Sequence, residues 1–235
     1  MYMEVGRLVG LWRYPVKSMA GEPLEAAEVS WHGVAGDRRW AFVRAGVERS
    51  GFPWLTIRER PELTAYRPRF TDPARPDASP TRVRTPSGAE HDVLDPELAA
   101  GLGHGARVIK QDRGVFDTFP LSLISTQTVT GLSESVGKAL DVRRFRPNLV
   151  VDAAGGEPYP EDTWVGATLR IGTLAVRVDK RDGRCSVVGV DPESGRRDPA
   201  VLRAIARERG RCAGVYGSTV EPGRVTLGDA VTIAR

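Results

Sequence analysis

Short strand-forming runs, each closed by glycine or proline, most constrain how this chain can fold. The run Val5–Val16 comes first, and residues 24–58 contain three more, Glu28–Trp31, Arg39–Val43 and Trp54–Ile57. Turn residues recur between these runs too often for long helices to fit. The spacing therefore predicts an antiparallel β unit in the first part of the chain.

A proline-rich segment follows. From Arg67 to Gly88 the chain carries five prolines, which are too closely spaced for a long regular element. We expect an exposed loop here. Within it, only Thr81–Thr85 favours a short strand, because Val83 and the threonines prefer an extended backbone.

Three helices are predicted from caps and apolar spacing. A short one begins at Pro96, and a longer one covers 125–140, where aliphatic residues recur at intervals of three and four. The third runs from Pro199 to Arg209, with Asp198 as its cap and Gly210 at its end.

The second half of the chain also contains β-branched and aliphatic runs that predict strands. These runs are Pro120–Ile124, Leu149–Val151, Leu169–Val178, Ser186–Val190, Val225–Leu227 and Val231–Ile233. We therefore predict a mainly β protein with a few helices (α+β), built as two packed β-barrel-like units. The first unit would span 1–115 and the second 116–235.

Composition narrows the class of protein. With 40% hydrophobic and 27% charged residues the chain is an ordinary globular sequence. Its net charge of +4 comes from scattered arginines, so we expect no nucleic-acid partner. Neither a secretory signal nor a membrane-spanning run is recognisable, which favours a cytoplasmic protein with reduced thiols.

Two cysteines, Cys185 and Cys212, are too few for an intrinsic iron–sulfur cluster or an all-cysteine zinc site. The sequence has no Gly-x-Ser-x-Gly elbow, no Walker loop and no dinucleotide fingerprint after a strand. Hydrolase, kinase and nicotinamide-enzyme interpretations therefore have little support.

Cys185 follows Arg184, and a neighbouring arginine lowers a thiol's pKa. A thiolate is a nucleophile and a soft-metal ligand, although a buried unreactive cysteine is the commoner situation. Lys17, Arg38 and Arg146 lie near proline or glycine turns, where a phosphate-bearing cofactor needs cations from separate loops. Surface salt bridging is the alternative interpretation of these cations.

Five short motifs, taken in their order along the chain, point to a known family. They are Tyr14–Ser18 (YPVKS), Gly36–Trp40 (GDRRW), Arg144–Val150 (RFRPNLV), Arg184-Cys185 and Val190–Gly195 (VDPESG). In these the chain resembles the MOSC family, named for the C-terminal domain of molybdenum-cofactor sulfurase, together with its N-terminal β-barrel region. Within that family it is most similar to the amidoxime-reducing component group.

The resemblance implies a molybdenum cofactor in its molybdopterin form, with Cys185 as the metal ligand and catalytic centre. It implies further that the pterin and its phosphate are held by Lys17, Ser18, Arg38, Arg146 and Asn148. Arg184 would lie against the cofactor, and Thr56 and Arg58 match a looser motif.

The implied activity is an oxidoreductase that reduces N-hydroxylated or N-oxide small molecules. Because the sequence ends at Arg235 without an appended ferredoxin-like domain, electrons would come from a separate ferredoxin- or flavoprotein-like partner. Val188 and Gly189 replace hydroxyl residues usual in the family, which removes any hydroxyl contact to the cofactor there. The alternatives are a sulfur-carrier or cofactor-binding module without its own turnover, and a relative that no longer binds the cofactor.

Overall fold

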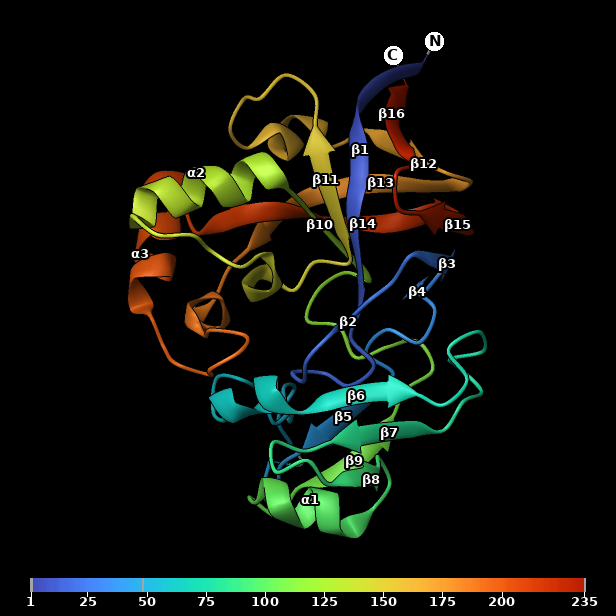
Figure 1. Ribbon diagram of the computed structural model, residues 1–235, viewed down its shortest axis with the longest axis vertical. Helices are drawn as coiled ribbons and strands as arrows, with labels where there is room; N and C mark the ends of the chain where they lie inside the picture. The colour runs from blue at the N-terminus through green and yellow to red at the C-terminus, as the bar shows by residue number, and fades with distance from the viewer. Residues whose placement is uncertain (1, 48, 235) are drawn as a thin grey trace.

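Seven strands close into a β-barrel that forms the upper lobe in Figure 1. This computed structural model describes residues 2–47 and 49–234. The barrel strands are β1 (Tyr2–Arg13), β10 (Leu121–Ser125), β11 (Leu149–Ala153), β12 (Thr168–Ile171), β13 (Leu174–Gly183), β14 (Cys212–Glu221) and β16 (Ala230–Ala234). Their order is β11-β10-β14-β13-β12-β16-β1, and β1 returns to β11.

The first strand completes a barrel that is otherwise built from the second half of the chain. β1 pairs antiparallel with β11 on one side and with β16 on the other. Gly6 belongs to both ladders, and a Cβ atom there would lie 2.4 Å from the carbonyl oxygen of Asp152. Only glycine lets the two backbones approach this closely.

The barrel interior is filled by the side chains that point inward from its strands. Leu8 and Leu11 of β1 pack there with Leu169, Val176 and Val178, all of them buried. In β13 the buried Val176 and Val178 alternate with the exposed Arg177, as a sheet with one face on a core requires.

The lower lobe in Figure 1 is a second β unit with its own core. It contains β5 (Trp40–Val43), β6 (Arg67–Phe70), β7 (Thr81–Arg84), β8 (Glu90–Asp92), β9 (Arg107–Lys110), α1 (Pro96–Leu102) and the 3₁₀ turn η1 (Pro61–Ala65). β5 pairs with β9, and β6, β7 and β8 form a separate antiparallel sheet.

The remaining elements link the two lobes or cover the barrel. β2 (Glu22–Pro23) pairs with β1, whereas β3 (Ala26–Ser30), β4 (Gly33–Val34) and β15 (Gly223–Thr226) form a small sheet whose buried residues belong to the barrel core. Helices α2 (Thr126–Val136) and α3 (Pro199–Arg209) pack together beside the barrel, and three 3₁₀ turns lie nearby: η2 (Val142–Phe145), η3 (Pro160–Trp164) and η4 (Ser186–Gly189). None of the helices in the described residues is long and apolar enough to cross a membrane.

The predicted fold class is confirmed: the protein is mainly β, with three α-helices in residues 2–47 and 49–234 and a second β unit packed on a closed barrel. The helix starts were predicted correctly because their signals are local, but the second helix ends at Val136, with Gly137 as its cap, rather than at 140. Asp95 and Asp198 accept the predicted capping hydrogen bonds from Glu97 N and Ala200 N. The division of the chain near residue 115 stays a prediction.

Ser186–Val190 was predicted as a strand, and this is wrong, since the segment forms the 3₁₀ turn η4. The segment is rich in valine because it fills the junction between the lobes. Val188 packs with the helices beside the barrel, whereas Val190 belongs to the core of the lower unit. A short buried run has the same composition in a turn as in a strand.

Three further strand predictions were imprecise. Leu169–Val178 is not one strand, because Gly172 at φ +55° turns the chain between β12 and β13. The expected loop after Arg67 begins with β6, where Pro68 is tolerated because β6 is an edge strand. Trp54–Ile57 makes only an isolated bridge, from Trp54 to Val43.

Candidate functional site

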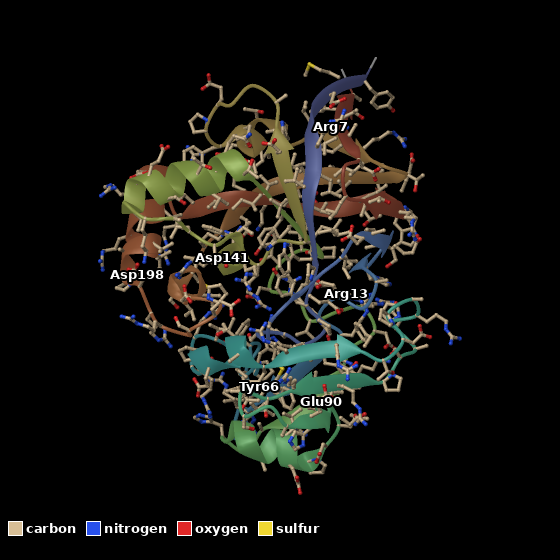
Figure 2. The ribbon with its side chains drawn as sticks, viewed as in Figure 1. Arg7, Arg13, Tyr66, Glu90, Asp141 and Asp198 are labelled. Atoms are coloured by element: carbon tan, nitrogen blue, oxygen red, sulfur yellow. The ribbon has the colours of Figure 1, made fainter. Side chains whose placement is uncertain are left out.

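A cavity of about 820 Å³, including its open mouth, lies where one end of the barrel meets the lower unit. Figure 2 labels Arg13, at the end of β1, and Tyr66, just before β6, on the two sides of this junction. All nine residues singled out from the sequence line this one cavity: Lys17, Ser18, Arg38, Thr56, Arg58, Arg146, Asn148, Arg184 and Cys185. Residues separated by up to 168 positions in the sequence are thus brought together.

The loop after β1 is tied to the segment before β5. Tyr14 N donates to Asp37 Oδ1 at 2.7 Å, and Arg38 N donates to the Tyr14 carbonyl at 2.7 Å. Lys17 N donates to the Trp40 carbonyl at 2.8 Å. These bonds fix Lys17 and Arg38 on one wall.

Three cavity residues have a left-handed backbone. Ser18 has φ +70°, Arg38 φ +50° and Arg146 φ +51°. They are half of the six non-glycine residues with positive φ in 2–47 and 49–234. A side chain in this region costs about 1–2 kcal/mol, and such strain concentrates at functional sites.

Two guanidinium groups lie over one buried aromatic ring. Arg38 and Arg146 are 4.7 and 4.2 Å from the centroid of Tyr14. Arg38 also pairs with Asp37, which outweighs the effect of burial and raises the pKa of Arg38. Arg146 forms no salt bridge within the described chain, and burial lowers its pKa to about 10. Its Nη1 donates to the Met19 carbonyl at 2.8 Å, whereas Nη2 is buried without a partner.

A second cationic group forms around Asp117. Its carboxylate accepts from Lys17 Nζ and pairs with Arg58 Nη2 at 3.4 Å. Lys17 Nζ also donates to the Val115 carbonyl at 3.1 Å. Burial lowers the pKa of Lys17 even though Asp117 opposes this effect.

Cys185 is half-buried and lies two residues after the end of β13, immediately before η4. Arg58 lies beside its sulfur: burial works to lower the pKa of Arg58, but Cys185 and then Asp117 raise it above its usual value. Thr56 shapes the turn that presents Arg58, since Thr56 Oγ1 bonds to Glu59 and accepts from Arg58 N at 3.3 Å.

Asn148 and Arg184 use most of their hydrogen-bonding atoms to bind other parts of the cavity wall. Asn148 Nδ2 donates to the Trp12 carbonyl, and its Oδ1 accepts from Ser122 N, both at 3.2 Å. Arg184 donates to the carbonyls of Ala213 and Phe145 at 2.6 and 2.8 Å, and pairs with Asp182. These contacts hold β1, β10, β13 and β14 in register around the site.

Sequence reasoning missed several lining residues, above all Asp182. This carboxylate is buried, and burial raises its pKa although Arg184 opposes the shift. Ser122 Oγ donates to Oδ2 at 3.1 Å, and Oδ1 is buried without a partner. The charged run 179–183 before Cys185 was the available signal. Nothing in the sequence pointed to Tyr216, which bonds to Asp182 from β14.

The charge on the cavity walls is unbalanced. Six cationic side chains line it, against two carboxylates, Asp117 and Asp182. The cations are Lys17, Arg38, Arg58, Arg144, Arg146 and Arg184. A cavity with this excess suits a ligand that carries negative charge, and the Cys185 sulfur adds a soft donor to it.

Two protein-family models together match most of the chain. The family model described as the MOSC domain matches residues 110–232, more than half of the chain, and that of the MOSC N-terminal beta barrel domain matches residues 5–98. Over 98% of its length the chain is 24% identical to the mitochondrial amidoxime-reducing component 1 of Homo sapiens, of which it covers 84%.

A second relative is longer. The chain is 24% identical over 97% of its length to the molybdenum cofactor sulfurase of Drosophila mojavensis, but it spans only 35% of that protein. Among solved structures, the YUAD protein from Bacillus subtilis has a similar fold, with a TM-score of 0.55 and 14% identity over 99% of this chain and 97% of that one.

Proposed function

Because the chain belongs to the MOSC domain family, we propose that it is a molybdenum-cofactor-dependent oxidoreductase with Cys185 as the metal ligand. The coarser part of this statement, a function associated with the molybdenum cofactor, follows from relatives named as amidoxime-reducing components and cofactor sulfurases. The observation that carries the finer part is the position of Cys185 in the cation-rich cavity.

The residues present fit such a cofactor in its molybdopterin form. A thiolate is a suitable ligand for a soft, sulfur-rich metal centre. The pterin's phosphate needs cations, and Arg146 offers a buried Nη2 that has no partner. Lys17 and Arg38 would share this phosphate, and Ser18 and Asn148 would line the pterin.

The cofactor, when bound, would supply two-electron redox chemistry. The chain's residues would orient it and control access. Arg58 would keep a positive charge beside the Cys185 sulfur, which becomes negative as a ligand. Arg184, held by three protein partners, would fix the backbone that carries Cys185.

The proposed substrates are small N-hydroxylated or N-oxide compounds. Reducing an N-hydroxyl group to N–H consumes two electrons and two protons and releases water. The electrons would come from a separate ferredoxin- or flavoprotein-like donor. Asp182 would hold one of the protons at Oδ1, the atom that lacks a partner, because burial favours its neutral form.

The test is turnover of an aromatic amidoxime by protein produced in a host that makes the cofactor, with a reduced viologen as electron source. Wild type is expected to form the amidine, and Cys185→Ser is expected to be inactive. Cys212→Ser is the matched control, since Cys212 is also half-buried but lies outside the cavity lining. A persulfide on Cys185 in intact-mass spectra, without any turnover, would favour the sulfur-carrier function instead.

A further inference from the structure

A second, smaller cavity of about 450 Å³ adjoins the first. The two share Ile57, Arg144, Arg146 and Val187 as walls. Four arginines line the second cavity: Arg67, Arg143, Arg144 and Arg146. None of the lining residues that the structure describes is acidic.

Two of these arginines are neutralised by carboxylates. Arg143 pairs with Asp141 and with Glu193, both at 2.5 Å, and these partners raise its pKa. Arg67 is exposed and pairs with Glu193 at 3.2 Å. Neither therefore needs a ligand.

The other two have free donors. Arg144 pairs with Asp191 through Nη2 at 2.5 Å, but its Nε and Nη1 are buried without partners, and only 6% of the side chain is exposed. Arg146, on the wall that the two cavities share, adds its unpartnered Nη2, whose two hydrogens can serve the pterin's phosphate on one side and an anion here on the other. Buried N–H groups without acceptors cost free energy, so such groups indicate an unfilled acceptor position.

A hydroxyl group is the fourth unpartnered donor of this cavity. The Tyr14 hydroxyl is buried, has no partner and belongs to the same cavity. Burial raises the pKa of Tyr14 to about 12, so this group keeps its proton and donates. All four unpartnered polar side-chain atoms among the described lining residues are thus donors: Arg144 Nε, Arg144 Nη1, Arg146 Nη2 and Tyr14 Oη. A ligand that only accepts hydrogen bonds, an anion, matches this set.

We propose that the second cavity is an anion subsite that receives a phosphate group beside the main cavity. The phosphate could belong to a nucleotide extension of the molecule in the main cavity or to a free ligand. Asp191 regulates the subsite's strength, because its carboxylate competes with the anion for Arg144. The inference concerns binding alone and holds whether or not the protein carries molybdenum.

The test uses cofactor-free protein titrated with inorganic phosphate by calorimetry. Arg144→Met is expected to weaken binding about tenfold or more, because charge-assisted donors are lost. Asp191→Asn is expected to strengthen it. Arg207→Met is the matched control, since that arginine is 70% exposed on α3 and pairs with Glu208. Because Arg144 lines both cavities, Tyr14→Phe identifies the second one: Tyr14 lines only that cavity, and loss of its hydroxyl is expected to weaken phosphate binding as well.

Arg144→Lys guards against a folding defect, because lysine keeps the charge facing Asp191 while removing Nε and Nη1. It is expected to bind phosphate as weakly as Arg144→Met. Equal affinity in all variants, or no phosphate binding by wild type, would overturn the proposal.

The source of the phosphate is read from cofactor-loaded protein. If a nucleotide is released on denaturation and the loaded protein no longer binds phosphate, the cofactor's own extension fills the subsite. If no nucleotide is released and the loaded protein still binds phosphate, the subsite serves a separate anionic ligand. Both results support the subsite.

Discussion

The guanidinium of Arg146 lies 4.2 Å from the centroid of the Tyr14 ring. Arg38 and Arg144, by contrast, each pair with a carboxylate. A cation over an aromatic face is attracted without being neutralised. Tyr14 therefore keeps Arg146 buried at the junction of the lobes while leaving its charge available. The second guanidinium over this ring, that of Arg38, is paired with Asp37.

Arg146→Ala is expected to lower the cofactor content of the protein. The loss of one charge-assisted hydrogen bond to a phosphate corresponds to about 2 kcal/mol, or about thirtyfold in affinity. Pterin released on denaturation, measured by fluorescence, gives the occupancy. Full occupancy in this variant would leave Arg146 a purely structural role.

Arg146→Gly separates ligand binding from backbone strain. Arg146 has φ +51°, which glycine adopts without cost. The glycine variant should hold the cofactor as poorly as the alanine variant, yet be more stable by about 1 kcal/mol in urea unfolding. Equal stability of the two variants would argue against strain at this position.

Gly214→Ala is expected to destabilise the barrel by about 2–3 kcal/mol, because a methyl group would meet backbone as well as strain the chain. Its Cβ would lie 2.6 Å from the Leu123 carbonyl oxygen and 3.0 Å from Arg184 Nη2. Gly137 is the matched control: its φ is +75° against +76°, but a Cβ there meets nothing within 4 Å. Similar losses in urea unfolding for both alanine variants would contradict the role of close packing at β14.

Asp198→Ala is expected to cost about 1 kcal/mol at neutral pH, because the cap of α3 is lost. The hydrogen bond from Lys138 and then the cap itself lower the pKa of Asp198 below its usual value. The stability that this carboxylate gives is present above its unfolded-state pKa and disappears as pH falls through the lowered folded-state value. Wild type and variant should therefore converge in melting temperature at low pH. A gap that is independent of pH would contradict the charge's part in the cap.

The sequence predicted elements well where the signal lies within one segment, and poorly where it depends on contacts between distant segments. The bounds of α3 follow from Asp198, Pro199 and Gly210, all within one segment. β14 was not predicted, although it lies inside the barrel wall. Its glycines at 214 and 217 weaken any strand signal, and they are required by contacts with Leu123 and Val176 on neighbouring strands. Such contacts become visible only once the strands are paired.

The same contrast holds for the site. Cys185, Lys17 and Arg146 were identified because motif resemblance reports residues that a family uses in common. Asp182 and Tyr216 belong to no quoted motif, and they meet only because β13 and β14 pair across the barrel. Side chains that depend on strand pairing are therefore the ones that sequence reasoning misses.

The central claim is that Cys185 binds molybdenum. Elemental analysis of protein from a cofactor-competent host, with wild type, Cys185→Ser and Cys212→Ser compared, tests it most directly. We predict near-stoichiometric molybdenum in wild type and Cys212→Ser, and its loss from a Cys185→Ser protein that is still folded by circular dichroism. Molybdenum retained by folded Cys185→Ser, or absent from wild type, would contradict the account.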